Sequence, residues 1–383
     1  MSSDTESHSA APFLTAHGTG PRWQDAAGAV IQQLGTLDQS YRLGIVYVTP
    51  PFAQDLQDLE ILLRQATGVP HWIGTVGYGV IANGLETVEE PAIAAMVLPI
   101  EEEAFRVFDG VTEETDAVSR DHTDWLGTVT TAPLVIAHAD MANQFVPGLI
   151  RDLSEETDGY IVGGLACASG RGAQLADGPT GGGLSGVMIA PERTPLQTGI
   201  TQGCSPIGPA HAVTQAEGPV ILTLDDRPAL EVFKRDIGEP LASHLEDVAG
   251  NIFAALPVPG SDQRDYMVRP LTGIDVQNGV IAIGQGVTEA DHVMFCRRDR
   301  QAAVEDMRAM LADLKRRVGG RDVRGALYIS CAARGPHQFQ PPERETQLIA
   351  ECFGDIPLVG FFANGEISRD RLYGYTGVLT LFF

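Results

Sequence analysis

The sequence predicts an α/β protein with mixed sheets, in two domains that are built from one repeated unit. The first observation is a short apolar run, a Gly-led turn and a closing strand, which recur near residues 71–98, 160–189 and 356–383. The second is that each copy follows a β-branched run and a segment with helical apolar spacing. The unit is therefore strand, helix, strand, Gly-rich turn, strand. The glycine that recurs after the second strand favours a structural repeat over the ordinary alternation of α/β proteins.

The chain opens with a polar segment and a short helix before the first unit. Residues 1–20 are small and polar, and we expect a disordered tail there. Residues 23–34 predict a helix. A strand at 43–48 and a helix over 53–67 then begin the first unit, because the leucines of the second segment fall on one helical face.

The second unit follows an acidic segment, 109–124, which has no periodicity and predicts an exposed loop. A strand at 133–137 precedes a helix over 141–157. Pro147 either kinks this helix or occupies its first turn. The loop 169–183 contains six glycines, so it is either flexible or wraps around a ligand.

The middle of the chain is first β-rich and then helical. A hairpin is expected over 211–224, a helix over 229–236 and another over 241–253. The change of pattern places the domain boundary between about 224 and 240. We therefore predict domains at residues 21–228 and 229–383.

The third unit closes the chain after a segment of mixed structure. A hinge rich in Pro, Gly and Ser is expected at 257–263, and the longest helix over 299–318. The unit itself has a strand at 326–330 and a helix over 343–353.

The composition favours a cytoplasmic protein without a nucleic-acid or membrane partner. The 383 residues include 26 basic and 50 acidic side chains, which give a net charge of −24. A protein that binds the phosphates of nucleic acids or of anionic membranes needs a positively charged surface. The N-terminus lacks the pattern of a signal peptide, and no run approaches the roughly 20 apolar residues that span a bilayer. The five cysteines form no CxxC pair, so the sequence indicates neither a disulfide scaffold nor a zinc site.

Two Gly-rich turns are candidate ligand contacts, at Gly74 and Gly77 and at Gly163 and Gly164. Neither turn has the spacing of a phosphate-binding loop. Their glycines permit positive φ or close backbone approach at strand ends, and ligands of α/β sheets often bind beside such turns.

Cys331 and Arg334 lie where a buried strand ends. The arginine could lower the pKa of the thiol or bind a carboxylate. Because His337 is near in sequence, a Cys–His nucleophile is one alternative, and an ordinary packed cysteine is another.

The turn Asn364-Gly365-Glu366 is the last candidate. Asn-Gly is a turn former, and Glu366 follows it directly. If Glu366 shares a cleft with Arg334, the two charges suit a zwitterion such as an amino acid. An ion pair between the two residues is the alternative.

The nine histidines have no metal-binding spacing, so we expect no metal and no cofactor. Haem remains the alternative cofactor, because a single axial histidine leaves no spacing pattern.

The chain resembles the FIST family over about residues 25–383. The resemblance rests on GCSPIGPAHAVTQAEGPVILTLDDRPALEVF at the domain junction, on ISCAARG, and on IPLVGFFANGEI near the C-terminus. Where family members tend to read G-C-x-x-x-G-E, this chain has Thr75 and Val80 in place of the cysteine and the glutamate, so its ligand or its affinity is expected to differ.

The resemblance implies a sensory protein that binds a small ligand, an amino acid being the favoured class. It implies a pocket between the domains, lined by Cys331, Arg334, Asn364, Gly365 and Glu366. Gly74, Gly77, Gly163, Gly164 and Cys204 are second-rank positions.

FIST proteins occur with histidine kinases and diguanylate cyclases, and this chain shows no fused output domain. We therefore expect a separate signalling partner and no catalysis. The alternatives are a haem-binding gas sensor, a thiol enzyme that uses Cys331 with His337 or His71, and a protein that serves only as an interaction module.

Overall fold

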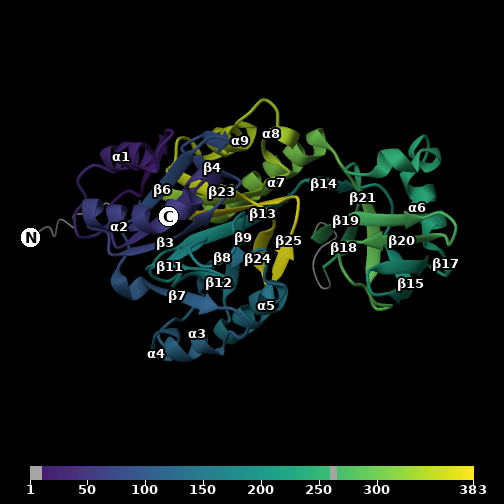
Figure 1. The fold of residues 1–383 in the computed structure, drawn as a ribbon, viewed down its shortest axis with the longest axis horizontal. Coiled ribbons are helices and arrows are strands. Elements are labelled where there is room, and N and C mark those ends of the chain that lie inside the picture. Colours follow the sequence, from purple (N-terminus) through teal and green to yellow (C-terminus); the bar gives the residue numbers. More distant parts are fainter. Residues whose placement is uncertain (1–10, 259–264) are drawn as a thin grey trace, which may run out of the picture. The chain divides into compact units, whose positions relative to one another are not determined.

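The structure is a computed structural model that describes residues 11–258 and 265–383, and it confirms the predicted mixed α/β class (Figure 1). These residues form two compact units. The first contains the chain up to Ile200 with Arg308–Leu372 and Thr376–Phe383, and the second contains Thr201–Met307 and Tyr373–Tyr375. These units are discontinuous in sequence, whereas the predicted domains, 21–228 and 229–383, are continuous segments. The predicted boundary at residue 228 stays a prediction.

Three six-stranded sheets make up the first unit. The first sheet has the order β1 (Leu14–Thr19), β6 (Ala92–Leu98), β2 (Leu43–Val48), β3 (His71–Val76), β10 (Gln174–Ala176), β11 (Pro179–Thr180). The second has the order β7 (Phe105–Val111), β12 (Leu184–Ile189), β8 (Leu134–Asp140), β9 (Tyr160–Ala166), β24 (Glu366–Arg369), β25 (Arg371–Tyr373). The third has the order β13 (Leu196–Gln202), β26 (Thr376–Phe382), β22 (Gly325–Cys331), β23 (Leu358–Ala363), β4 (Gly79–Ala82), β5 (Leu85–Val88).

The three sheets share one strand arrangement. In each, the strand before the helix pairs in parallel with the strand after it and antiparallel with the closing strand, as β2 does with β3 and β6. The hairpin that follows the Gly-rich turn joins a different sheet: β4–β5 pairs with β23, β10–β11 with β3, and β24–β25 with β9. Each sheet therefore receives its hairpin from another copy, and the exchange closes in a cycle.

The prediction that the recurring glycine follows the second strand is wrong: in all three copies it lies inside that strand, and it has a packing reason there. The glycines and their parallel partners are Gly74 with Val46, Gly163 with Ala137, and Gly360 with Tyr328. A Cβ atom at these glycines would lie 2.0, 1.8 and 1.7 Å, in that order, from the carbonyl oxygen of the partner. No side chain fits at that distance, so the position requires glycine.

A single buried cluster joins the three sheets. It includes Tyr47 of β2, Ile136 of β8 and Phe361 of β23. Helices cover the opposite faces, with α1 and α2 on the first sheet and α5 on the second (Figure 1). The described helices are α1 (Trp23–Leu34), η1 (Pro50–Asp55), α2 (Leu56–Thr67), η2 (Glu102–Ala104), α3 (Asp116–Asp121), α4 (Thr123–Leu126), α5 (Val146–Thr157), α6 (Ala229–Ile237), η3 (Leu241–Ser243), η4 (Leu245–Val248), α7 (Arg300–Val318), α8 (Gly335–Gln338) and α9 (Arg344–Phe353).

The second unit is an antiparallel sheet closed on itself. Its order is β14 (Cys204–Pro206), β21 (His292–Arg298), β15 (His211–Glu217), β16 (Val220–Leu224), β20 (Val280–Ile283), β19 (Tyr266–Asp275), β18 (Ile252–Pro257), with β17 (Arg227–Pro228) beside β16. Because β18 also pairs with β21, the strands from β21 to β18 form a ring. Helix α6 packs against this ring through Leu230 and Phe233.

The helix predicted over 241–253 is wrong. The segment forms two short 3₁₀ turns, η3 and η4, and then enters β18. Ala249 ends η4 with ψ 128°, Gly250 has φ 74°, and Ile252 starts a strand that pairs on both sides. The spacing of Leu241, Leu245 and Val248 is helical. The pairing of β18 with β19 and β21 nevertheless ends the helical segment before Ile252.

The segment 109–124 is largely exposed, as predicted, but it is not a loop. Strand β7 reaches Val111, and α3 and α4 follow. Val118 and Trp125 are buried in the core of the second sheet. Polar and charged residues fill the segment between Val118 and Trp125, so too few apolar positions remain to show a helical spacing.

Three further expectations can be compared with the structure. Helix α5 begins at Val146 with Pro147 in its first turn, so the proline starts the helix. Within the expected tail, Leu14–Thr19 forms β1 and pairs with β6, and residues 1–10 lie outside the described part. The hinge predicted at 257–263 lies largely outside it as well. Among the described residues, no helix is long and apolar enough to cross a membrane.

Candidate functional site

The C-terminal candidate residues lie at one edge of the third sheet. Strands β22 and β23 are parallel neighbours, and Cys331 is opposite Ala363 in their register. The segments that leave these strands, which carry Arg334 and Glu366, therefore start from the same edge. This is the end of a parallel pair at which ligands of α/β proteins commonly bind.

Arg334 is fully buried and pairs with an acid. Its Nε donates a hydrogen bond to Oε1 of Glu345 at 3.0 Å, and Glu345 is also fully buried. The guanidinium carbon lies 4.7 Å from the centre of the Phe339 ring. Glu345, which lies in the first turn of α9, is not among the ligand contacts predicted from the sequence.

Glu345 collects several further donors. The hydroxyl of Tyr328 donates to Oε1 at 2.6 Å, and that of Ser330 lies 3.0 and 3.1 Å from the two oxygens. The amide of Gly335 donates to Oε2 at 3.2 Å. These bonds satisfy the carboxylate where water is excluded, which a buried ion pair requires.

Glu366, the first residue of β24, is the second buried acid. Its Oε2 accepts hydrogen bonds from the Thr376 hydroxyl at 2.7 Å and from the Thr376 amide at 3.1 Å. Burial raises the pKa of Glu366 to about 8, against the opposing effects of Thr376, of a hydrogen bond from the Cys331 thiol and of the Arg334 charge. The carboxyl is therefore largely protonated near neutral pH, beside a thiol and a guanidinium.

The turn at Asn364 and Gly365 carries the chain from the third sheet to the second. The amide of Leu165 donates to the Gly365 carbonyl at 2.9 Å, and Gly164 is opposite Glu366 in the register. A Cβ atom on Gly164 would lie 2.7 Å from that of Ala363. The structure thus brings Gly164 to the cluster.

The other second-rank positions lie elsewhere. Gly77 is beside β23, where a Cβ atom would be 2.8 Å from that of Phe361. Gly74 and Gly163 are inside strands and face neighbouring carbonyl groups. Cys204 begins β14 in the second unit, where it packs with Cys296. Their roles in ligand binding stay predictions.

His71 is poorly suited to activate the thiol of Cys331. Its Nδ1 lies 2.6 Å from Asp177 and its Nε2 2.7 Å from Glu102, so both ring nitrogens are engaged. The side chain of His337 lies outside the described part of the structure. A Cys–His nucleophile at that residue stays a prediction.

A third acid, Glu86 of β5, extends the cluster. It accepts hydrogen bonds from the amide and the hydroxyl of Thr346 at 3.0 and 3.2 Å. Burial, followed by the charge of Glu345, raises its pKa to about 7. Two carboxyl groups, those of Glu86 and Glu345, therefore lie at the start of α9, and the pairing of β4 with β23, which no local motif encodes, brings them together.

Metal binding has no structural counterpart in the described residues. Within 11–258 and 265–383, no group of three or more His, Cys, Asp or Glu side chains is arranged to hold an ion.

Two family models match the chain. The FIST N domain matches residues 42–227 and the FIST C domain matches residues 229–369. The uncharacterized protein Rv0628c of Mycobacterium tuberculosis is 34% identical over 193 residues, which are 48% of this chain and 50% of that protein. The uncharacterized protein Mb0898c of Mycobacterium bovis is 36% identical over 194 residues, 48% of this chain and 49% of that protein. The chain thus spans about half the length of these curated relatives.

Proposed function

Because the chain belongs to the FIST family, with both its N-type and C-type domains, we propose that it is a small-ligand sensory protein of signal transduction. It acts in the cytoplasm without catalysis, and it signals through a separate protein such as a histidine kinase or a diguanylate cyclase. The ligand is an amino acid or another small zwitterion.

The observation that carries the proposal is the burial of Arg334, Glu345 and Glu366 in one cluster at the end of a parallel strand pair. Buried charges cost stability unless they are paired, and clusters with shifted pKa values are concentrated at functional sites. A ligand carboxylate would replace Glu345 on Arg334, and a ligand ammonium would face Glu366. When the ligand replaces Glu345 on Arg334, the start of α9 would favour a second conformation. The signalling protein would bind this conformation preferentially.

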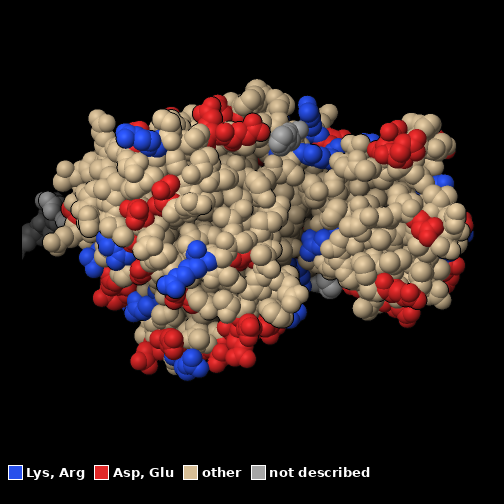
Figure 2. Space-filling model, viewed as in Figure 1, with Lys and Arg blue, Asp and Glu red and all other residues tan. Residues whose placement is uncertain are grey.

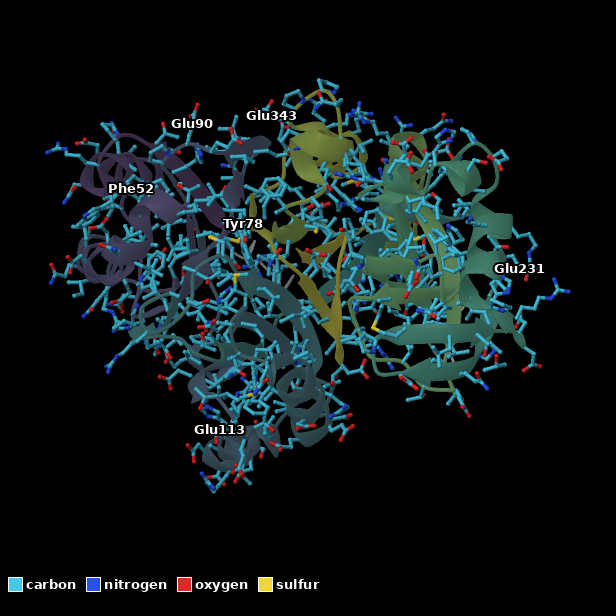
Figure 3. The ribbon with its side chains drawn as sticks, turned by 45° about the vertical axis from the view of Figure 1, so that its right-hand side comes forward. Phe52, Tyr78, Glu90, Glu113, Glu231 and Glu343 are labelled. Carbon is cyan, nitrogen blue, oxygen red and sulfur yellow. The ribbon has the colours of Figure 1, made fainter. Side chains whose placement is uncertain are left out.

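A thermal-shift screen of the purified protein against amino acids, nucleotides and haem tests the proposal. A ligand that binds only the folded state raises its apparent stability. Arg334→Lys and Glu366→Gln should abolish the shift. Glu90→Gln is the matched control, since Glu90 is exposed and points to the outside in Figure 3. A shift that survives both substitutions would contradict the assignment of the site.

Calorimetry gives a sharper test of Glu366. A ligand ammonium stabilises the ionised carboxylate, so binding near pH 7 should release the proton that Glu366 holds. The apparent enthalpy of binding should therefore depend on the ionisation enthalpy of the buffer, and this dependence should vanish in Glu366→Gln. Binding without proton release would contradict the proposal that a ligand ammonium faces Glu366.

Haem is the alternative cofactor, and His138 is the most deeply buried histidine of the described residues. Its ring lies 5.4 Å from Tyr47 and 6.0 Å from Phe361 between ring centres, and its Nε2 lies 3.1 Å from the Tyr47 hydroxyl. A ring enclosed in this way does not fit an axial haem ligand. We therefore propose that the protein acts without haem, and a Soret band in the protein as isolated would contradict this.

A further inference from the structure

A cavity of about 500 Å³ lies in the first unit, where the chain leaves β8 and enters α5. Pockets for small molecules occupy roughly 300–1,000 Å³. Its walls come from the segment after β7, the β8–α5 connection and the Gly-rich loop at Gly170 and Gly182. This is the position in the second copy that corresponds to Arg334 in the third, and here it is open.

Asp140, the last residue of β8, holds the Gly-rich loop in place. It is 2% exposed, and its Oδ2 accepts hydrogen bonds from the amides of Gly170 at 2.7 Å and Gly182 at 3.1 Å. Its Oδ1 accepts from the amide of Ala142 at 2.9 Å. Burial acts to raise the pKa of Asp140, but these amides and Ser169 together hold it below its ordinary value. A fixed negative charge thus lies at the base of the cavity.

Asn143 joins two of the walls. Its Nδ2 donates to the carbonyl groups of Thr112 and Gly182, each at 2.8 Å, and its Oδ1 accepts from the amide of Phe145. The cavity is therefore formed before any ligand arrives, which reduces the entropy that binding must offset.

The groups left over for a ligand are an acid and an aromatic ring. Phe145 is 52% exposed. Glu113 is exposed at the surface near α3 and α4 (Figure 3), and no described residue donates a hydrogen bond to it. The residues that line the cavity carry two carboxylates and no Lys or Arg, and acidic side chains are prominent on this part of the surface in Figure 2.

We propose that this cavity binds a small organic ammonium ion, with the cation against the face of Phe145 and between the charges of Asp140 and Glu113. An aromatic face attracts an organic cation, and the effect grows as the cation loses water. The carboxylates exclude anions, and the ring favours an alkylated ammonium over a strongly hydrated inorganic ion. The site is separate from the Arg334 cluster and does not depend on the function proposed for it.

The test uses choline, tetramethylammonium and ethanolamine as probes, with ligand-observed NMR titration of the whole protein. Choline should saturate, and its uncharged carbon isostere should not. Phe145→Leu keeps an apolar side chain but removes the aromatic face, and it should weaken choline binding by about 2- to 30-fold. Glu113→Gln should weaken binding several-fold, and the loss should shrink at high salt.

Glu114→Gln is the matched control, because Glu114 is the exposed neighbour of Glu113 and does not line the cavity. It should leave the affinity unchanged. All three substitutions are at exposed positions, so the variants should fold. Equal binding of the uncharged isostere, affinity that neither Phe145→Leu nor Glu113→Gln alters, binding of calcium alone, or no saturation by any probe would each overturn the proposal.

Discussion

Arg334 donates a hydrogen bond from Nε to Oε1 of Glu345 at 3.0 Å, and neither side chain is exposed to solvent. The pair joins the end of β22 to the first turn of α9. A buried charge needs a partner because water cannot solvate it. Removal of either residue should therefore destabilise the fold.

Removal of the acid from this pair should destabilise the first unit strongly. Glu345→Gln leaves the Arg334 charge buried without its counter-charge, and we expect a loss of about 3–5 kcal/mol in the free energy of unfolding. Urea denaturation measures it. The control is Glu351→Gln, on the exposed side of the same helix, where the change should be small because the ion pair with Arg344 is at the surface. A loss below about 1 kcal/mol at Glu345 would show that the buried pair is not formed.

Stability should fall as the pH rises, because of Glu366. Its pKa is about 8 in the folded chain and ordinarily 4.5, so between these values the folded state holds a proton that the unfolded state has released. The contribution of Glu366 is complete below the lower value and is lost as the pH approaches 8, with a slope of at most about 1.4 kcal/mol per pH unit. Denaturation at about pH 5.5 and about pH 8 should show a smaller decrease in Glu366→Gln than in the parent. Equal decreases would mean that Glu366 ionises normally.

The recurring glycine should not tolerate a methyl group. In Gly360→Ala the new Cβ atom would lie 1.7 Å from the Tyr328 carbonyl oxygen. The strands would have to separate, at a cost of about 1–3 kcal/mol or more. Gly28→Ala is the opposite case, since Gly28 is in α1 with no atom within 4 Å of the added methyl, and it should stabilise the chain by about 0.5–1 kcal/mol. Melting temperatures that move in the same direction for both variants would contradict this account.

His138 and His71 should behave differently in an NMR titration. Burial lowers the pKa of His138 to about 3, so its ring signals should not change between about pH 5 and about pH 8. The hydrogen bond to Asp177 raises the pKa of His71 above its ordinary 6.5, so its signals should change at a midpoint above that value. His138→Gln and His71→Gln assign the signals. Titration of His138 near pH 6.5 would mean that the core around Tyr47 admits water.

Local pattern was sufficient for much of the fold. The strand and helix of each copy and the helix after Pro228 follow from apolar spacing and backbone chemistry, which act over a few residues. Where tertiary pairing opposed a local pattern, as in β18, the prediction from sequence failed.

For the candidate site, local pattern indicates that Arg334 and Glu366 follow the ends of buried strands and that glycine recurs in each copy. The folded chain alone shows that Arg334 pairs with Glu345, that Glu86 reaches this pair on the hairpin of the first copy, and that the copies exchange their hairpins. The physical reason is that an ion pair or a strand pair depends on which surfaces meet after folding. Residues such as Glu86 and Glu345 are 259 positions apart, and no local periodicity specifies their contact.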